Sequence, residues 1–299
     1  MKEKSSLKDR KGIVGWITVV FLTIYSLTMI LLFLWGVFAS LKTRGNWLRD
    51  PVFLPEGNPF EWGWENFKTV WENFTVRKII NGQKVEITFF GLTVNTLIYT
   101  FGSAFIATAA TCIVSYCVAK FPYRFSAIVY TFVLIAMVVP IIGSAPSMLL
   151  LLNRLNIYDS YLSMFIMKFT YLDMYFLVFH AIYKSISPEF SEAALLDGAN
   201  EWQIFFKIMI PLVIPTFLTV FLIKFIETWN EYQWQLLYLP SYPTLAYGVY
   251  HMARSGDNAI SAPPYKMASC VLMATPILVL FIVFRNKILG NITMGGVKE

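Results

Sequence analysis

The sequence is poor in charged side chains and in the residue types that build catalytic and metal sites. Only 14% of its 299 residues are charged, and its two histidines are His180 and His251. Soluble domains carry about 25% charged residues, so an ordinary soluble fold is excluded. No nucleophile–base pair or metal-ligand spacing accompanies either histidine, so we expect neither a catalytic centre nor a metal site.

Cysteine is scarce as well. Cys112, Cys117 and Cys270 each fall inside an apolar stretch of the chain. Thiols in such surroundings usually pack as small apolar side chains and are chemically inert. We therefore expect no redox or metal-binding role for these residues.

Long apolar runs take the place of charge. Hydrophobic residues make up 57% of the chain, and the mean hydropathy is +0.59. A bilayer core is spanned by about 20 apolar residues in a helix. Uncharged stretches of 18 residues or more cover 12–41, 87–119, 125–153 and 267–284, and two apolar stretches with a few charges cover 158–183 and 208–239. The sequence predicts an all-α polytopic membrane protein with six transmembrane helices in a lipid bilayer and no cleavable leader.

The net charge of +6 reflects orientation in the membrane and does not indicate nucleic-acid binding. Six spans place both termini on one side, and the segments of that side carry twelve lysines and arginines. The short connections of the opposite side carry three, although the long connection 42–86 holds seven more. Basic residues favour the cytoplasmic side. We therefore expect residues 1–11 and 291–299 in the cytoplasm and the loop 42–86 outside it.

The loop 42–86 contains two local patterns. Aromatic residues recur at helical spacing and predict a short amphipathic helix at the membrane interface: Trp64, Phe67, Trp71 and Phe74. Asn81-Gly82, between residues that favour strands, predicts a small β-hairpin near 78–86. A disordered insertion remains the alternative for this second stretch.

The connection 185–211 is longer than a simple turn and reads as two short helices. Ser187 and Pro188 favour a helix start, and Gly198 favours its end in a left-handed conformation. Asn200 and Gln203 have the spacing of a capping box for the second helix. The first helix carries the small residues Ala193 and Ala194, and the second carries an apolar face: Trp202, Phe205, Phe206 and Met209. This pattern favours a docking element, and a linker packed only on its own bundle is the alternative.

Several of these stretches resemble a known family. Glu192-Ala193-Ala194, Asp197-Gly198-Ala199 and Ile210-Pro211-Leu212 resemble the EAA loop of binding-protein-dependent ABC importers. Further stretches are similar to the maltose-type sugar permeases: Asn95-Thr96-Leu97, SYCVAKF at 115–121, FIETWNEY at 225–232, Tyr242-Pro243-Thr244-Leu245 and GGVK at 295–298. The resemblance covers about residues 13–299, and the stretch 77–86 departs from it as an extension of the first outer loop.

The resemblance implies a permease subunit in the bacterial inner membrane that moves a carbohydrate into the cell by alternating access. It implies as partners two ATPase subunits, a second homologous permease subunit and an extracytoplasmic solute-binding protein. The chain contains no G-x-x-x-x-G-K-[S/T] motif, so we expect no enzyme activity and no cofactor in this chain, with ATP and magnesium held by the ATPase. An ABC permease for a non-sugar solute and an ion-coupled secondary transporter remain alternatives.

The resemblance also implies roles for individual residues. The residues that would couple to the ATPase are Glu192, Ala193, Ala194, Asp197, Gly198 and Pro211. In this reading Glu192 meets a basic residue of the ATPase, the alanines allow close approach, and Gly198 permits the turn. The tail 295–298 would touch the ATPase. Arg254, Gly256 and Asp257 would contact the binding protein.

Candidates for the translocation path lie in the second and fifth spans: Asn95, Glu227, Trp229, Asn230 and Glu231. On a continuous helix Lys224, Glu227 and Glu231 would share one stripe, which could line the path or form a structural ion pair. Trp229 could stack on a sugar or pack against a neighbouring helix. Lys168 and Asp173 lie about 140° apart on a helix and are not expected to pair with each other. Pro140 and Pro146 around Gly143 predict a kinked or broken helix in the third span.

Overall fold

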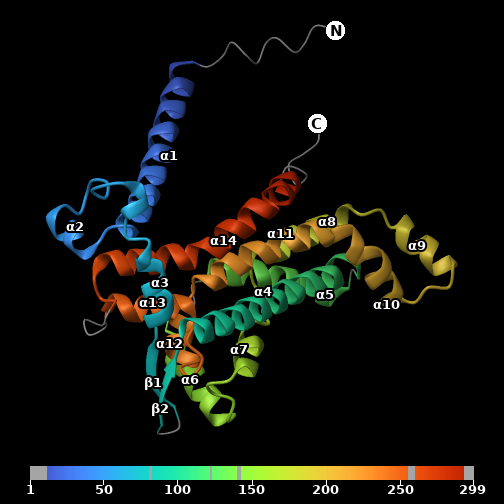
Figure 1. Cartoon of the computed structure of the whole chain (residues 1–299). Coiled ribbons are helices and arrows are strands. Elements are labelled where there is room, and N and C mark those ends of the chain that lie inside the picture. Colours follow the sequence, from blue (N-terminus) through green and yellow to red (C-terminus); the bar gives the residue numbers. More distant parts are fainter. Residues whose placement is uncertain (1–11, 81–82, 122, 140–142, 255–259, 293–299) are drawn as a thin grey trace. The chain divides into compact units, whose positions relative to one another are not determined.

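The computed structural model describes residues 12–80, 83–121, 123–139, 143–254 and 260–292, and helices dominate these residues (Figure 1). The longest are α1 (Ile13–Ser40), α4 (Phe89–Lys120), α5 (Arg124–Val138), α11 (Ile210–Trp229) and α14 (Pro263–Ile292). The shorter helices are α2 (Arg44–Arg49), η1 (Pro59–Glu61), α3 (Glu65–Asn73), α6 (Ala145–Arg154), α7 (Tyr161–Lys168), α8 (Met174–Ser185), α9 (Glu189–Leu196), α10 (Glu201–Ile204), the π-helical η2 (Phe205–Met209), α12 (Gln233–Tyr238) and α13 (Leu245–Arg254).

The chain forms two compact units, Met1–Phe74 with Met252–Ala274 and Thr75–His251 with Thr275–Glu299. Among the described residues four helical stretches are long and apolar enough to cross a membrane: Gly15–Ser40, Phe89–Lys120, Glu201–Trp229 and Pro263–Phe284. The apolar helix α5 is shorter. An all-α protein with several membrane-spanning helices is therefore the observed fold class.

Three of the expected spans are not continuous helices. The break predicted in 125–153 is confirmed, because α5 ends at Val138, Gly143 has a φ of +80°, and α6 begins beside Pro146. The predicted single helix over 158–183 is wrong. It is divided into α7 and α8 because Asp173 adopts an extended conformation and caps α8, with its carboxylate accepting a hydrogen bond from the Phe176 amide.

The predicted single helix over 208–239 is also wrong. Helix α11 ends at Trp229, and α12 begins at Gln233. Glu231 lies between them and pairs with Lys168 of α7 across 2.8 Å. Because Glu231 lies beyond the end of α11, it does not continue the helical stripe of Lys224 and Glu227 that the sequence predicted.

Helix α4 forms the centre of the second unit and packs against both α8 and α11. Its buried face is built mostly from small residues: Ser103, Ala104, Ala107, Thr108, Ala110, Thr111 and Ser115. Small residues let helix backbones approach closely within a membrane. Gly102 likewise lets α4 approach α7 closely, because a Cβ atom at this position would lie 2.5 Å from the ring of Phe165.

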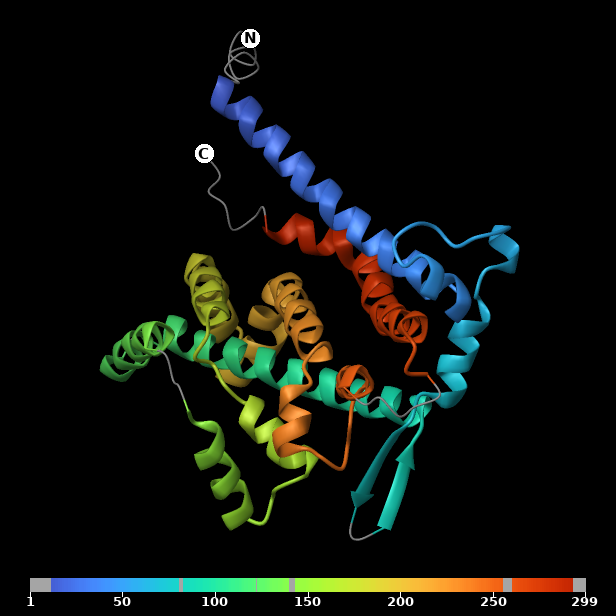
Figure 2. The same cartoon turned by 90° about the vertical axis from the view of Figure 1, so that its left-hand side faces the viewer.

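Strands β1 (Val76–Ile80) and β2 (Gln83–Ile87) pair antiparallel directly before α4 (Figure 2). Residues 81 and 82, which carry the expected turn, lie outside the described residues. Lys78 of β1 donates a hydrogen bond to the Pro240 carbonyl at 2.6 Å, and its Nζ lies 4.1 Å from the centre of the Tyr247 ring. The hairpin is thus tied to the segment between α12 and α13.

In the first unit, the helix predicted near residues 64–74 is present as α3. Its apolar face is not shared as expected, because Phe74 is buried whereas Trp64 and Trp71 are more than half exposed. Asn66 holds α3 against the end of α1, since its side-chain amide donates to the carbonyls of Ser40 and Lys42 at 2.8 Å each.

Candidate functional site

The expected pair of short helices is present as α9 and α10. Helix α9 begins at Glu189, and the Ser187 hydroxyl accepts a hydrogen bond from the Glu189 amide at 3.3 Å. At its other end Gly198 has a φ of +82° and donates to the Leu195 carbonyl, while Ala199 donates to the Ala194 carbonyl. This is a Schellman ending, and only glycine adopts it without strain.

The second helix begins with the predicted capping box. The Asn200 side chain accepts from the Gln203 amide, and the Gln203 side chain accepts from the Asn200 amide, both at 2.9 Å. The chain then passes through the π-helical turn η2 into α11, whose first turn contains Pro211. The ends of α9 and the start of α10 are therefore defined by hydrogen bonds within the segment itself.

The inner side of this helical pair is anchored to the bundle. Ala194, Ile204, Phe205 and Met209 belong to a core cluster with side chains of α4 and α8: Cys112, Tyr116, Phe179 and Tyr183. The ring centres of Tyr116 and Phe205 lie 4.7 Å apart. Lys120, at the end of α4, donates to the Ile186 carbonyl at 2.8 Å and so holds the chain just before α9.

The two alanines that were expected to let a partner approach closely differ in exposure. Ala194 is only 8% exposed and faces its own chain, whereas its neighbour Ala193 is exposed. The small side chain of Ala194 lets α9 approach α10 and η2. The sequence could not assign the two alanines to different sides before the position of α9 on the bundle was known.

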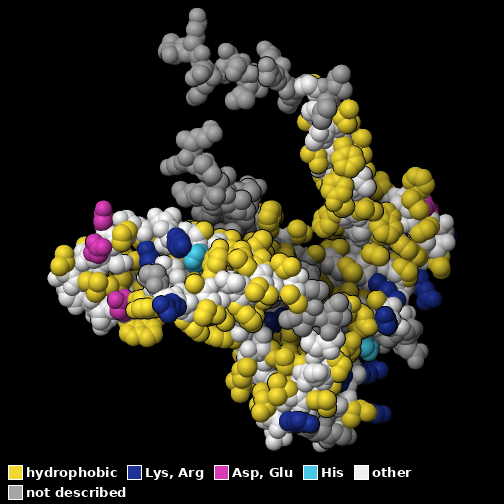
Figure 3. Space-filling model, turned by 180° about the vertical axis from the view of Figure 1, so that it is seen from behind, with side chains coloured by type: hydrophobic (Ala, Val, Ile, Leu, Met, Phe, Trp, Pro, Cys, Tyr) yellow, Lys and Arg dark blue, Asp and Glu magenta, His cyan; other side chains and the backbone are white. Residues whose placement is uncertain are grey.

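The outer side of α9, α10 and η2 carries exposed apolar side chains. Trp202 and Phe206 belong to the apolar face predicted for the docking element, whereas Phe190, Leu195 and Leu196 were not singled out from the sequence. Leu196 is 90% exposed, and the Trp202 and Phe206 rings stack with their centres 6.2 Å apart. Acidic side chains gather at this end of the molecule (Figure 3). Glu192, Asp197 and Gly198 are exposed there as well.

The prediction that one helix face carries all four apolar residues is wrong: Trp202, Phe205, Phe206 and Met209. Phe205 and Met209 are buried, whereas Trp202 and Phe206 point outward. The π-helical turn starts at Phe205, and its wider turn changes the angular relation that an α-helix would give these residues.

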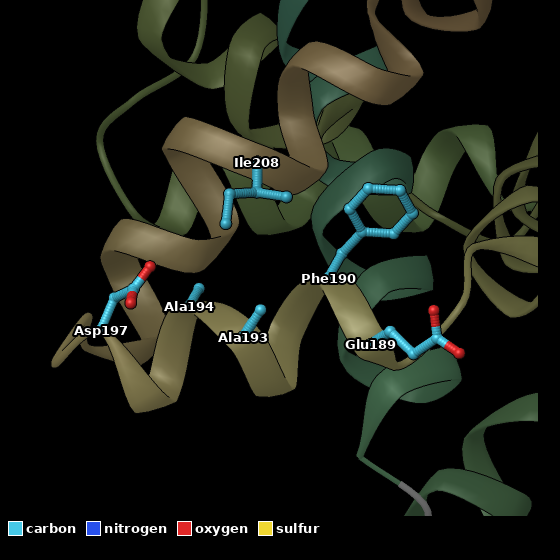
Figure 4. Close-up of a pocket in the computed structure, with 6 residues that line it drawn as sticks. All are labelled: Glu189, Phe190, Ala193, Ala194, Asp197 and Ile208. Carbon is cyan, nitrogen blue, oxygen red and sulfur yellow. The ribbon is translucent and has the colours of Figure 1, made fainter.

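A hollow of about 290 Å³ lies between α9 and η2 (Figure 4). Phe190, Ala193 and Ala194 point across it toward Ile208, and Glu189 and Asp197 lie at its two ends. A single water occupies about 30 Å³ of liquid. The hollow is therefore large enough to admit a side chain from a partner.

The charged residues of the membrane spans form two ion pairs between helices. Lys168 bonds Glu231 at 2.8 Å, and the Tyr99 hydroxyl donates to the same carboxylate at 2.7 Å. Lys224 pairs with Asp173 at the start of α8. The prediction that Lys168 and Asp173 do not pair with each other is confirmed, because each pairs with a residue in the C-terminal part of α11 or just beyond it.

The other path candidates lie in different surroundings. Asn95 is held in place, because its amide donates to the Pro243 carbonyl and its oxygen accepts from Tyr161, both at 3.1 Å. Trp229 is 1% exposed and packs on Phe225 with ring centres 5.7 Å apart, so it is a packing residue and presents no ring to a path. Glu227 and Asn230 are exposed.

The stretches that carry the family resemblance meet in space. Thr96 accepts a hydrogen bond from the Leu245 amide at 2.8 Å, which joins the start of α4 to the segment before α13. Arg254 is exposed at the end of α13. Gly256, Asp257 and the tail 295–298 lie outside the described residues.

Comparison with known proteins decides the family. The model of the "Binding-protein-dependent transport system inner membrane component" family matches residues 111–291, which include α9, α10 and α11. The chain belongs to this family. It is therefore an inner-membrane component of an ABC transport system, and partners of such a system are expected for it.

Characterised relatives match over most of their length. The chain is 24% identical to the diacetylchitobiose uptake system permease protein NgcG of Streptomyces coelicolor over 92% of this chain and 86% of that protein. It is 24% identical to the melibiose/raffinose/stachyose import permease protein MelC of Bacillus subtilis, over 87% and 88%. A solved bacterial ABC transporter involved in the import of the acidic polysaccharide alginate has the same fold, with a TM-score of 0.72, 22% identity and coverage of 92% and 96%.

Proposed function

We propose that this chain is the permease subunit of an ATP-driven importer that moves a carbohydrate into the cell, and that α9 and α10 are its docking contact for the ATPase. The observation that carries the proposal is the two-sidedness of this helical pair. Its inner side is buried against α4 and α8, and its outer side exposes Leu196, Trp202 and Phe206. Large apolar side chains exposed together mark interaction sites.

The anchoring explains how docking would move the bundle. A rigid core transmits displacement, because close-packed side chains cannot slide independently. Motion of the ATPase would move α9, and the contacts of Ala194, Ile204 and Phe205 would pass it to α4, α8 and α11. Alternating access by movement of helical bodies around a central site follows this pattern.

The transported class is inferred from the relatives, whose names give sugars and oligosaccharides as their cargo. The full assembly would contain two ATPase subunits with ATP and magnesium, a second homologous permease and an extracytoplasmic binding protein. We place both termini in the cytoplasm and six spans in the membrane, with the broken stretches α5–α6 and α7–α8 as the third and fourth. The hairpin would then lie outside the cell.

The test is a charge reversal at the docking surface. Glu192→Lys places a positive charge where we expect a basic residue of the ATPase, and like charges in contact weaken binding strongly. Since Glu192 is exposed, the variant folds and inserts normally. We expect recovery of the ATPase with the tagged permease to fall about tenfold, together with ATP-driven sugar uptake in proteoliposomes.

Glu65→Lys is the matched control, because Glu65 is also exposed but belongs to α3 in the first outer loop. It should leave recovery of the ATPase unchanged. Normal co-purification and uptake by Glu192→Lys would show that the docking assignment is wrong.

A further inference from the structure

The polar groups near the end of α11 do not balance in charge. Two pairs are neutral, Lys168 with Glu231 and Lys224 with Asp173. Glu227 of α11 is a third carboxylate, in addition to Asp173 before α8 and Glu231 after α11, and it forms no ion pair within the described part of the chain. The group therefore carries one net negative charge.

Glu227 is positioned beside this group and is open to its surroundings. It lies three residues after Lys224, so both side chains project from one face of α11. The Lys224 ammonium lies 5.2 Å from the centre of the Tyr175 ring, which places Tyr175 next to the same face. Glu227 is exposed, and Asn230, three residues further on, is exposed as well.

An ionised carboxylate in a membrane span normally faces a watery cavity or a protein partner and not lipid. A carboxylate, an aromatic ring and an amide together suit a hydroxylated ligand, because the oxygens accept hydroxyl protons and the ring packs against an apolar face. The same carboxylate repels an anion, and it does so strongly where water is scarce.

We infer that Glu227, with Tyr175 and Asn230, forms a sugar-contacting wall of the translocation path that admits uncharged or amine-bearing carbohydrates and disfavours acidic ones. This inference rests on the proposed function. It disfavours negatively charged cargo, which the relatives leave open because one of the solved neighbours is involved in the import of an acidic polysaccharide.

The test uses a thiol reporter and needs no knowledge of the sugar. Asn230→Cys is introduced into a chain in which Cys117 and Cys270, both exposed in the isolated chain, are replaced by alanine. The complex purified with its ATPase is treated with trimethylammonium-ethyl or sulfonato-ethyl methanethiosulfonate. Each rate is divided by the rate with 2-mercaptoethanol, so that the ratio of the two reports only the local potential.

We expect both reagents to react, with the cation favoured over the anion. Glu227→Gln, which keeps the size of the side chain, should lower the cation-to-anion ratio about tenfold, given a separation of about 5–6 Å on one helix face. Glu65→Gln, which removes a carboxylate from α3, should leave the ratio unchanged.

Two results would overturn this inference without contradicting the proposed importer function. A ratio that Glu227→Gln does not change means that Glu227 sets no potential at the reporter. A reporter that reacts in the isolated chain but not in the assembled complex means that the wall is a subunit interface. Failure of the chain to retain any ATPase is a different result, and it would remove the proposed function itself.

Discussion

Lys168 and Glu231 come from segments that are 63 positions apart and form an ion pair with little exposure, 18% and 21% for their side chains. Lys168 also lies 4.1 Å from the Trp234 ring centre, and Tyr99 donates to the carboxylate. Removing one member of such a pair leaves a charge with few partners, and this costs more than the pair contributes. The residues therefore hold α7, α4 and the end of α11 together.

Lys168→Met should lower the free energy of unfolding by about 2–3 kcal/mol. The double variant Lys168→Met/Glu231→Gln should recover most of this loss, because no charge is then left without a partner. Denaturant unfolding in detergent micelles, followed by tryptophan fluorescence, measures both.

The Arg77–Glu86 pair of the hairpin is the control, since its side chains are 79% and 49% exposed. Arg77→Ala should cost less than about 1 kcal/mol. Equal losses for Lys168→Met and Arg77→Ala would contradict the structural role assigned to the buried pair.

At the scale of elements, Lys78 holds the hairpin to the segment between α12 and α13. Burial lowers the pKa of Lys78 to about 8, although the nearby Asp159 acts in the opposite direction. The unfolded chain therefore binds more protons than the folded chain between pH 8 and about 10.5, the usual lysine value. In that window stability rises with pH, and below pH 8 the cost of burying the charged amine is fully present.

We expect the amides of β1 and β2 to become better protected from hydrogen exchange between pH 8 and 10, after correction for the intrinsic rate. Lys78→Met keeps the apolar stem but has no titrating amine, so its protection should not vary with pH in this window.

Lys84→Met serves as the control because Lys84 is exposed on β2. It should retain the pH dependence of the unmodified chain. The same dependence in Lys78→Met would show that another group is responsible for it.

At the scale of the whole molecule, α4 lies between the hairpin and the segment that carries the proposed docking helix α9. The hairpin directly precedes Phe89, and Lys120 at the other end contacts the chain just before α9. A helix of 32 residues is long enough to cross a membrane, so we expect the hairpin and α9 on opposite sides of it.

Single cysteines at Lys84 and Leu196, in the background without Cys117 and Cys270, test this arrangement. In intact cells without an outer-membrane barrier, a membrane-impermeant maleimide should label Lys84→Cys. It should label Leu196→Cys only after the membrane is opened. The reverse pattern would place α9 outside the cell, where it could not meet an ATPase.

The sequence by itself determined the features that depend on neighbouring residues. Apolar runs indicated the membrane, Gly198 indicated the end of α9, Asn200 and Gln203 indicated the start of α10, and Pro146 with Gly143 indicated a break. Each of these depends on the chemistry of a few residues in a row, such as a missing Cβ atom or a local hydrogen bond. Composition and local pattern were sufficient for them.

Only the tertiary structure decided which side of each element is used. It turned Ala194 inward and left Leu196 outside, it buried Trp229, and it paired Lys168 and Lys224 with acidic residues distant in sequence. Such choices depend on which helices meet, and a contact between segments 51 or 63 positions apart leaves no periodic trace in either one. Asp173 before α8 and Glu231 after α11 lie at two of the helix breaks and are also the acidic partners in these long-range pairs.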